Sequence, residues 1–131
     1  MVSKQLQSYQ NNSVNTASGP QLTLMLYNGC IKFINQSLKA LEENNYEAKN
    51  KNLQKAQDII RELMITLDPS VEISNQLMAL YDYIYYNLQQ GNINNDVAKI
   101  NESLELVTEF RDTWKEAMKL EAGKYVQGAQ V

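Results

Sequence analysis

The chain has 131 residues, a formal net charge of −3 and no dense run of Lys or Arg, so its charge gives little reason to expect nucleic acid or a membrane surface as a partner. Histidine is absent and the five glycines form no phosphate-binding loop, so we expect no enzyme and no metal, cofactor or small-molecule substrate. No apolar run approaches the roughly 20 residues that cross a bilayer, and the first residues lack the apolar centre of a signal peptide, so we expect a cytosolic protein.

The composition favours an all-α fold. Only five Gly and two Pro interrupt the chain, and its apolar residues recur three and four positions apart, as on one face of a helix. A chain of this length is most simply a single domain with a sizeable core. We divide it into a mobile N-terminal arm (1–17), a four-helix bundle (18–119) and a C-terminal tail (120–131).

Residues 1–17 are rich in Gln, Asn, Ser and Thr, with Tyr9 and Val14 among the few apolar positions. A segment this polar cannot order itself by burial. We therefore expect an arm that lies on the domain or moves free of it.

The first helix is predicted to run from Ser18 to about Glu43, and it is apolar on two faces. One stripe holds Leu24, Tyr27, Ile31, Ile34, Leu38 and Leu41, and a second holds Leu22, Met25, Leu26, Gly29, Cys30 and Phe33. Such a helix must be covered on two sides. One cover is the rest of the domain, and the other is a further segment of this chain or a different protein. The arm is a candidate for a detachable cover, and Cys30 is expected to be a small buried hydrophobic residue.

Three further helices are predicted. The second begins near Tyr46 and stops at Asp68–Pro69, because the residue before proline is pushed out of helical geometry. The third begins at Ser70, and Gly91 is placed just past its end. Its core stripe is Ile73, Leu77, Leu80, Ile84 and Leu88. Asn94 or Asn95 caps the fourth, which loses its apolar period after about Leu120. Short connections predict an antiparallel up-down-up-down bundle.

Eight tyrosines are an unusual share of the aromatic residues in this chain. Tyr81, Tyr83, Tyr85 and Tyr86 lie within six residues of one helix, so they cannot all face one core. Either they sit at the edges of the bundle with their hydroxyls in water, or Tyr83 and its neighbours line a groove for an amphipathic helix. Acidic residues of the fourth helix, such as Glu102, Glu105 and Glu109, are expected on a solvated face.

Five segments, taken together and in this order, resemble the flagellar secretion chaperone (FliS) family. They are Thr16–Ser18 with Leu22–Phe33, Lys55–Leu63, Leu80–Tyr83, Asn95–Asp96 and Phe110–Lys115. One local departure is Gly19, which separates Ser18 from Pro20 where the family commonly has Ser-Pro or Thr-Pro.

The resemblance implies a cytosolic chaperone that binds the disordered C-terminal segment of flagellin one-to-one. It would prevent premature polymerisation and assist delivery to the flagellar type III export apparatus. Tyr9 with Val14 matches a tyrosine context that matters for binding in the family. Further client contacts are expected at residues chosen because we expect them to be exposed: Ile59, Leu63, Tyr83, Ile100, Leu104 and Val107. The alternative is a structural or regulatory bundle that homodimerises through a surplus apolar face.

Overall fold

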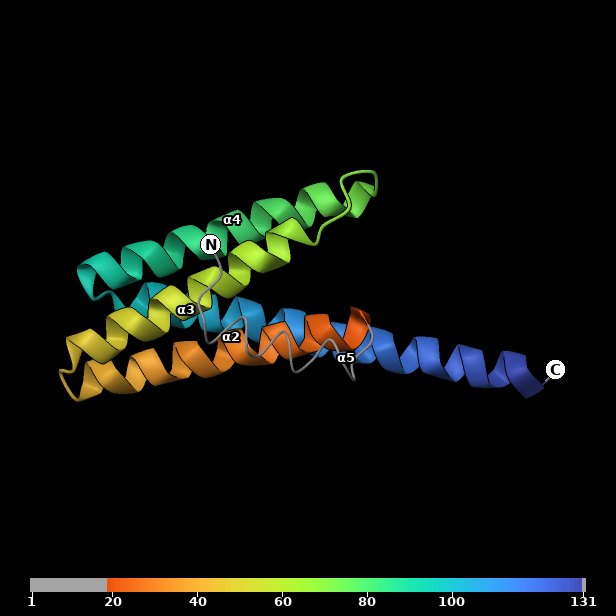
Figure 1. Ribbon diagram of the computed structural model, residues 1–131, viewed down its shortest axis with the longest axis horizontal. Helices are drawn as coiled ribbons and strands as arrows, with labels where there is room; N and C mark the ends of the chain where they lie inside the picture. The colour runs from red at the N-terminus through yellow and green to blue at the C-terminus, as the bar shows by residue number, and fades with distance from the viewer. Residues whose placement is uncertain (1–18, 131) are drawn as a thin grey trace.

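The computed structural model describes residues 19–130, which form four α-helices. These are α2 (Gly19–Glu42), α3 (Tyr46–Ile65), α4 (Glu72–Asn94) and α5 (Val97–Gln130). Consecutive helices run in opposite directions, each packs on its neighbours in sequence, and α5 closes the ring against α2 (Figure 1). The predicted all-α antiparallel four-helix bundle is confirmed. Within the described range, we find no helix with the length and apolar character of a membrane span.

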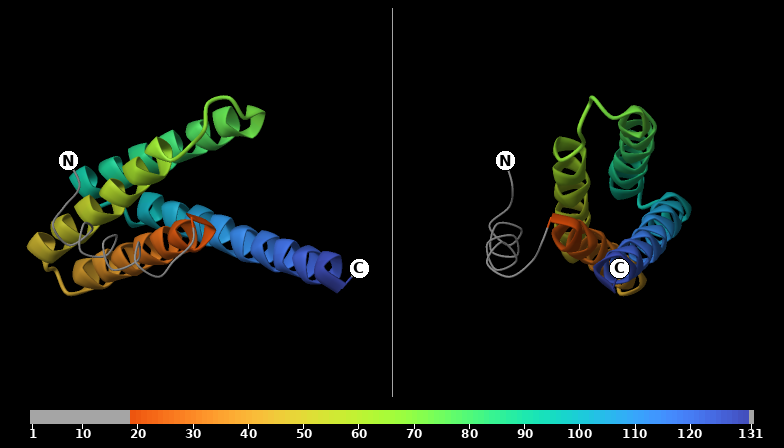
Figure 2. Two further views of the ribbon diagram at one scale, coloured as in Figure 1. Left: turned by 45° about the vertical axis from the view of Figure 1, so that its right-hand side comes forward. Right: turned by 90° about the vertical axis from the view of Figure 1, so that its right-hand side faces the viewer.

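The bundle is closed at one end and divergent at the other. At the closed end the α2–α3 and α4–α5 connections are short, and the buried Lys49 ammonium of α3 donates a hydrogen bond of 2.8 Å to the Asn92 carbonyl of α4. At the other end the α3–α4 connection stands away from α2 and α5 (Figure 2). Helix α5 also extends past the start of α2 (Figure 1). The pair α3–α4 and the pair α2–α5 therefore form the two arms of a V (Figure 2).

The core lies where the four helices meet. Its fully buried side chains include Leu26, Ile34, Leu53, Ile60, Ile84, Leu88, Ile100 and Val107. Cys30 is part of this core, as predicted: its Sγ lies 3.8 Å from the Ala56 carbonyl oxygen, and burial raises the pKa of the thiol. The thiol therefore stays protonated and contributes to packing as a small apolar group.

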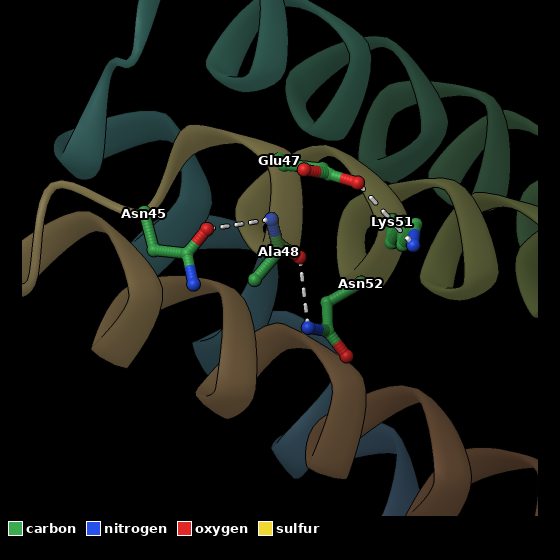
Figure 3. A network of polar contacts seen from close by, with 5 residues as sticks. All are labelled: Asn45, Glu47, Ala48, Lys51 and Asn52. Carbon is green, nitrogen blue, oxygen red and sulfur yellow. Dashed lines mark hydrogen bonds and ion pairs between the residues drawn. The ribbon is translucent and has the colours of Figure 1, made fainter.

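Polar side chains set the starts of two helices. Asn45 caps α3, because its side-chain oxygen accepts the Ala48 N–H at 3.1 Å (Figure 3). For α5 the predicted cap was wrong: Asp96 accepts the Lys99 N–H at 3.3 Å. Asn95 instead adopts the left-handed conformation (φ 52°) and ends α4, donating its backbone N–H to the Gly91 carbonyl. Ser18, the predicted cap of the first helix, lies outside the described residues.

Two predicted helix ends were also wrong. Gly91 does not follow α4 but lies inside it, where α4 meets α5: a Cβ at this position would lie 2.6 Å from Ile100 Cγ1. The glycine therefore serves close packing rather than a turn. Helix α5 continues beyond Leu120 to Gln130, because residues such as Glu121 and Ala122 favour a helix without needing a buried face.

Candidate functional site

The two apolar faces of α2 are covered by this chain itself. Helix α2 packs most extensively on α3 and also against α5. Leu26, Tyr27, Cys30 and Ile34 are buried, and the remaining large apolar side chains of both stripes are at least partly buried. Of the two covers left open by the sequence, the structure therefore supports a second segment of the chain. The surplus apolar surface lies elsewhere.

That surplus lies on α4 and on the connection that precedes it. Ile73, Leu80 and Tyr83 of α4 are 57%, 40% and 48% exposed. Their spacing of seven and three residues places them along one side of the helix, at about 100° per residue. We call these three residues the apolar row. Ile65 and Val71, at the end of α3 and in the connection, are also exposed. The three side chains of the apolar row therefore leave much of their apolar surface in water.

Tyr83 connects the apolar row to α5. Its hydroxyl donates a hydrogen bond to Oε1 of Glu102, and the same oxygen accepts from Asn87 Nδ2 at 2.8 Å. The ring of Tyr83 is thereby held in place while much of its surface stays in water. Glu102, Glu105 and Glu109 are exposed, as predicted for a solvated face, although Glu102 also binds α4. Tyr83 is therefore the member of the apolar row that a hydrogen bond anchors to a second helix.

The four clustered tyrosines point in different directions, as the helical geometry requires. Tyr81 is buried, Tyr85 is partly buried and receives a hydrogen bond from Arg61, and Tyr83 and Tyr86 are exposed. The prediction that some of them reach the surface is confirmed.

A buried aromatic layer joins helices whose backbones do not meet. The hydroxyls of Tyr27 (α2) and Tyr81 (α4) form a hydrogen bond of 2.6 Å across the bundle. Both rings pack on Phe110 of α5, with centroids 6.2 and 5.6 Å away. Burial raises the pKa of both phenols, so the pair is neutral near pH 7. This layer fixes α4 relative to α2 across the bundle.

The predicted client contacts fall into three groups. Tyr83 is exposed, and Leu104 is partly buried. Ile59, Leu63, Ile100 and Val107 are at most 1% exposed and belong to the core, so the assumption that they are exposed was wrong. The reason is that α3 and α5 turn these faces toward the other helices. Tyr9 and Val14 lie outside the described residues. Contact between a client and any of these eight residues, Tyr83 included, stays a prediction.

Sequence reasoning missed Ile73 and Leu80 as surface residues. Both belong to the predicted core stripe of the third helix, and the stripe itself is right: Ile84 and Leu88 on it are fully buried. Periodicity gave no signal that the first half of the helix would lie where the bundle diverges. Among the residues described, no group of Cys, Asp or Glu side chains is arranged to hold a metal ion.

Comparison with known proteins adds an independent observation. The family model described as Flagellar protein FliS matches residues 2–121. The chain belongs to this family. It is 52% identical over 114 residues to the flagellar secretion chaperone FliS of Bacillus subtilis (strain 168), covering 87% of this chain and 86% of that protein. Identity to the flagellar secretion chaperone FliS of Escherichia coli (strain K12) is 34% over 110 residues, covering 82% and 81%. The resemblance found in the sequence is confirmed.

The FliS-like segments now have places in the fold. Apart from Thr16–Ser18, which lie outside the described residues, they lie on α2, on α3, on α4 and on α5, and Asn95–Asp96 forms the turn that ends α4 and caps α5. Leu80–Tyr83 holds two residues of the apolar row together with Tyr81 of the buried layer. One FliS-like segment therefore contributes both to the core and to the exposed surface.

Proposed function

We propose that this FliS-family protein is a cytosolic export chaperone for flagellin. It binds the disordered C-terminal segment of flagellin, prevents premature polymerisation and assists delivery to the flagellar type III export apparatus. Family membership supports the chaperone role. The observation that supports client binding is the apolar row, because exposed apolar side chains gathered on one side of a helix of a folded domain are typical of an interaction site.

The apolar row suits a segment that becomes helical when it binds. Ile73 and Tyr83 are ten residues apart, which corresponds to about 15 Å along a helix. An amphipathic helix of about three turns, with apolar residues three, four and seven positions apart, would cover this strip. A client segment that is disordered when free spends part of the interaction energy on its own ordering. This keeps the complex reversible, as delivery to an export apparatus requires.

The other predicted contacts are part of the same proposal. Tyr9 and Val14 would contact the client from the N-terminal arm, and the arm would act as a detachable cover of apolar surface. Leu104 is reachable at its exposed edge. The four core residues of the predicted set, Ile59, Leu63, Ile100 and Val107, would meet the client only if the helices separate.

The test is calorimetric titration of the full chain with a peptide of the last ~50 residues of the host's flagellin, a length that spans several helical grooves. We expect saturable one-to-one binding with a large negative heat-capacity change, because apolar surface is buried as the peptide folds. Heat without a heat-capacity change would argue against coupled folding, and absence of binding would refute the proposal.

A matched pair of variants locates the binding surface. Leu80→Asp places a charge within the apolar row and should weaken binding by about tenfold or more. Ile93→Asp makes the same change at a residue of α4 that is 67% exposed and outside the row. It should leave affinity within about twofold. Equal losses of peptide affinity in both variants would show that the client does not bind through the apolar row.

Light scattering of the purified chain addresses the alternative of a homodimerising bundle. A stable dimer that Leu80→Asp dissociates, combined with no binding of the flagellin peptide, would favour that alternative. A monomer that binds the peptide favours the chaperone.

A further inference from the structure

The apolar row ends beside a carboxylate that belongs to a different helix. Glu102 of α5 is exposed, and its Oε1 accepts hydrogen bonds from the Tyr83 hydroxyl and, at 2.8 Å, from Asn87 Nδ2. Asn87 is 2% exposed, so one of the two donors belongs to the interior of the bundle. The position of the carboxylate is therefore set by α4, the helix that carries the apolar row.

Glu102 has no cation beside it within residues 19–122. Lys99 lies three residues earlier on α5, but its ammonium lies over the ring of Tyr86, 5.9 Å from the ring centroid. The ion pairs in this range do not include Glu102. Both of its hydrogen bonds there are to Oε1, so Oε2 has no donor among the same residues. One oxygen of a carboxylate that is held in place is thus left for a partner.

A segment that covers the apolar row takes water from this carboxylate as well. The Tyr83 hydroxyl is bonded to Glu102, so a client that packs on the Tyr83 ring lies next to the carboxylate. A carboxylate that loses water without gaining a cation weakens binding, whereas a Lys or Arg placed beside it offsets the loss. Apolar contacts alone tolerate many client sequences, because they are not directional. The carboxylate therefore imposes a requirement that the apolar row does not.

We propose that Glu102 is a specificity-determining residue of the client site, where it forms an ion pair with a Lys or Arg of the flagellin C-terminal segment. The inference rests on the proposed function, because it concerns the surface to which the client would bind. Leu80 and Tyr83 are three residues apart, so a client helix that runs along α4 carries this Lys or Arg about one turn from the apolar side chain that packs on Leu80. The ion pair fixes the register of the client on the apolar row.

The experiment titrates the full chain and its Glu102→Gln variant with the flagellin C-terminal peptide at low and high salt. Glutamine keeps an oxygen that accepts hydrogen bonds from Tyr83 and Asn87 but lacks the charge, so the fold should not change. We expect Glu102→Gln to weaken binding by about three- to tenfold. The affinity of the variant should also fall less steeply than that of the wild type between about 0.05 and 0.5 M salt, because salt screens the ion pair.

A double-mutant cycle identifies the partner of Glu102. Each Lys and Arg of the peptide is changed in turn to Gln, and each altered peptide is titrated against the wild type and Glu102→Gln. For one position the two losses should not add, because either change alone removes the ion pair. Glu102→Lys combined with Glu at that peptide position should bind more tightly than Glu102→Lys with the unaltered peptide.

Glu105→Gln is the matched control. It makes the same change on α5 at another exposed carboxylate, for which residues 19–122 provide no hydrogen bond from α4. The affinity of this variant for the peptide should stay within about twofold of the wild type. Circular dichroism and urea denaturation check that both variants are folded.

Three results would overturn the proposal and leave the proposed function in place. Unchanged affinity of Glu102→Gln would show that the carboxylate stays in water in the complex. Equal losses from Glu102→Gln and Glu105→Gln would show that only the total charge of α5 matters. Additive losses for every altered peptide would show that no Lys or Arg of the client pairs with Glu102. Failure of the wild-type protein to bind the peptide is a separate result, which removes the proposed function together with this inference.

Discussion

Helices α2 and α4 differ in a way that their sequences do not suggest. Helix α2 carries two apolar stripes, yet its large apolar side chains are all buried or partly buried. The sequence of helix α4 predicts a single apolar stripe, yet two members of that stripe, Ile73 and Leu80, are exposed. The cause is position: α2 lies between α3 and α5, whereas the first half of α4 leaves the bundle with the α3–α4 connection (Figure 2). Exposure depends on where the neighbouring helices run, which periodicity does not encode.

The largest expected effect is a difference in protein stability when one apolar side chain is removed from each of the two helices. Ile34→Ala in α2 should lower the free energy of unfolding by about 2–5 kcal/mol, because the side chain is fully buried and its removal leaves a cavity. Leu80→Ala in α4 should lower it by less than about 1 kcal/mol, because that site is partly in water. Urea denaturation measures both. Comparable losses would mean that Leu80 is buried in solution and that the contrast between the helices is false.

The next effect concerns the contact that joins the two helices. Tyr81→Phe leaves the buried Tyr27 hydroxyl without its partner and should lower the free energy of unfolding by about 1–3 kcal/mol. Tyr27→Phe combined with Tyr81→Phe should be less costly than the sum of the two single changes, because no unpaired hydroxyl remains. A double-mutant cycle measured by urea denaturation gives the coupling. Strict additivity would show that the hydroxyls do not interact.

A smaller effect separates a glycine of α2 from a glycine of α4. Gly91→Ala should destabilise by about 1 kcal/mol, since overpacking against Ile100 outweighs the gain in helix propensity. Gly19→Ala at the start of α2 should not destabilise, since an added Cβ would meet nothing within 4 Å. Thermal unfolding of the two variants makes the comparison. A stabilised Gly91→Ala variant would show that α4 and α5 can move apart.

The smallest expected effect is a pH dependence. Burial raises the pKa of Tyr27 and Tyr81 above the value of 10.0 for an unperturbed tyrosine, so the folded protein keeps protons that the unfolded chain releases. Their contribution to stability is complete below pH 10 and is lost as the pH rises further. The variant that combines Tyr27→Phe and Tyr81→Phe should therefore lose less stability than the wild type between about pH 9.5 and 11. This range surrounds the pKa of about 10 of an unperturbed phenol. Parallel profiles in thermal unfolding would contradict the assignment.

Much of the fold follows from the sequence, and the exceptions have physical causes. The number and order of the helices and the burial of Cys30 follow from apolar spacing, which is a local property. The role of Gly91 does not, because a glycine near a helix end suits both a turn and a close contact, and only the distance to Ile100 decides between them. The cap of α5 was misplaced by one residue, because Asn95 and Asp96 are both good caps and the left-handed turn at Asn95 selects Asp96.

The candidate site was harder to predict. Tyr83 was found because crowded tyrosines must partly face water, which is a geometric argument. The prediction of Ile59, Leu63, Ile100 and Val107 as client contacts assumes that they are exposed, and the structure buries them. Apolar spacing identifies which side of a helix faces its neighbours, but not how far along the helix the neighbours remain in contact. The point at which the neighbouring helices lose contact with α4 determines which of its residues form the apolar row.

The indole of Trp114 donates a hydrogen bond of 2.9 Å to the carbonyl of Pro20, and it is the only tryptophan in the chain. This contact joins α5 to the first turn of α2, directly after the segment that holds Tyr9 and Val14. The emission of a single indole responds to the loss of such a bond and to the entry of water. The protein therefore carries its own optical reporter at the base of the N-terminal segment, readable in any titration without a dye or a label.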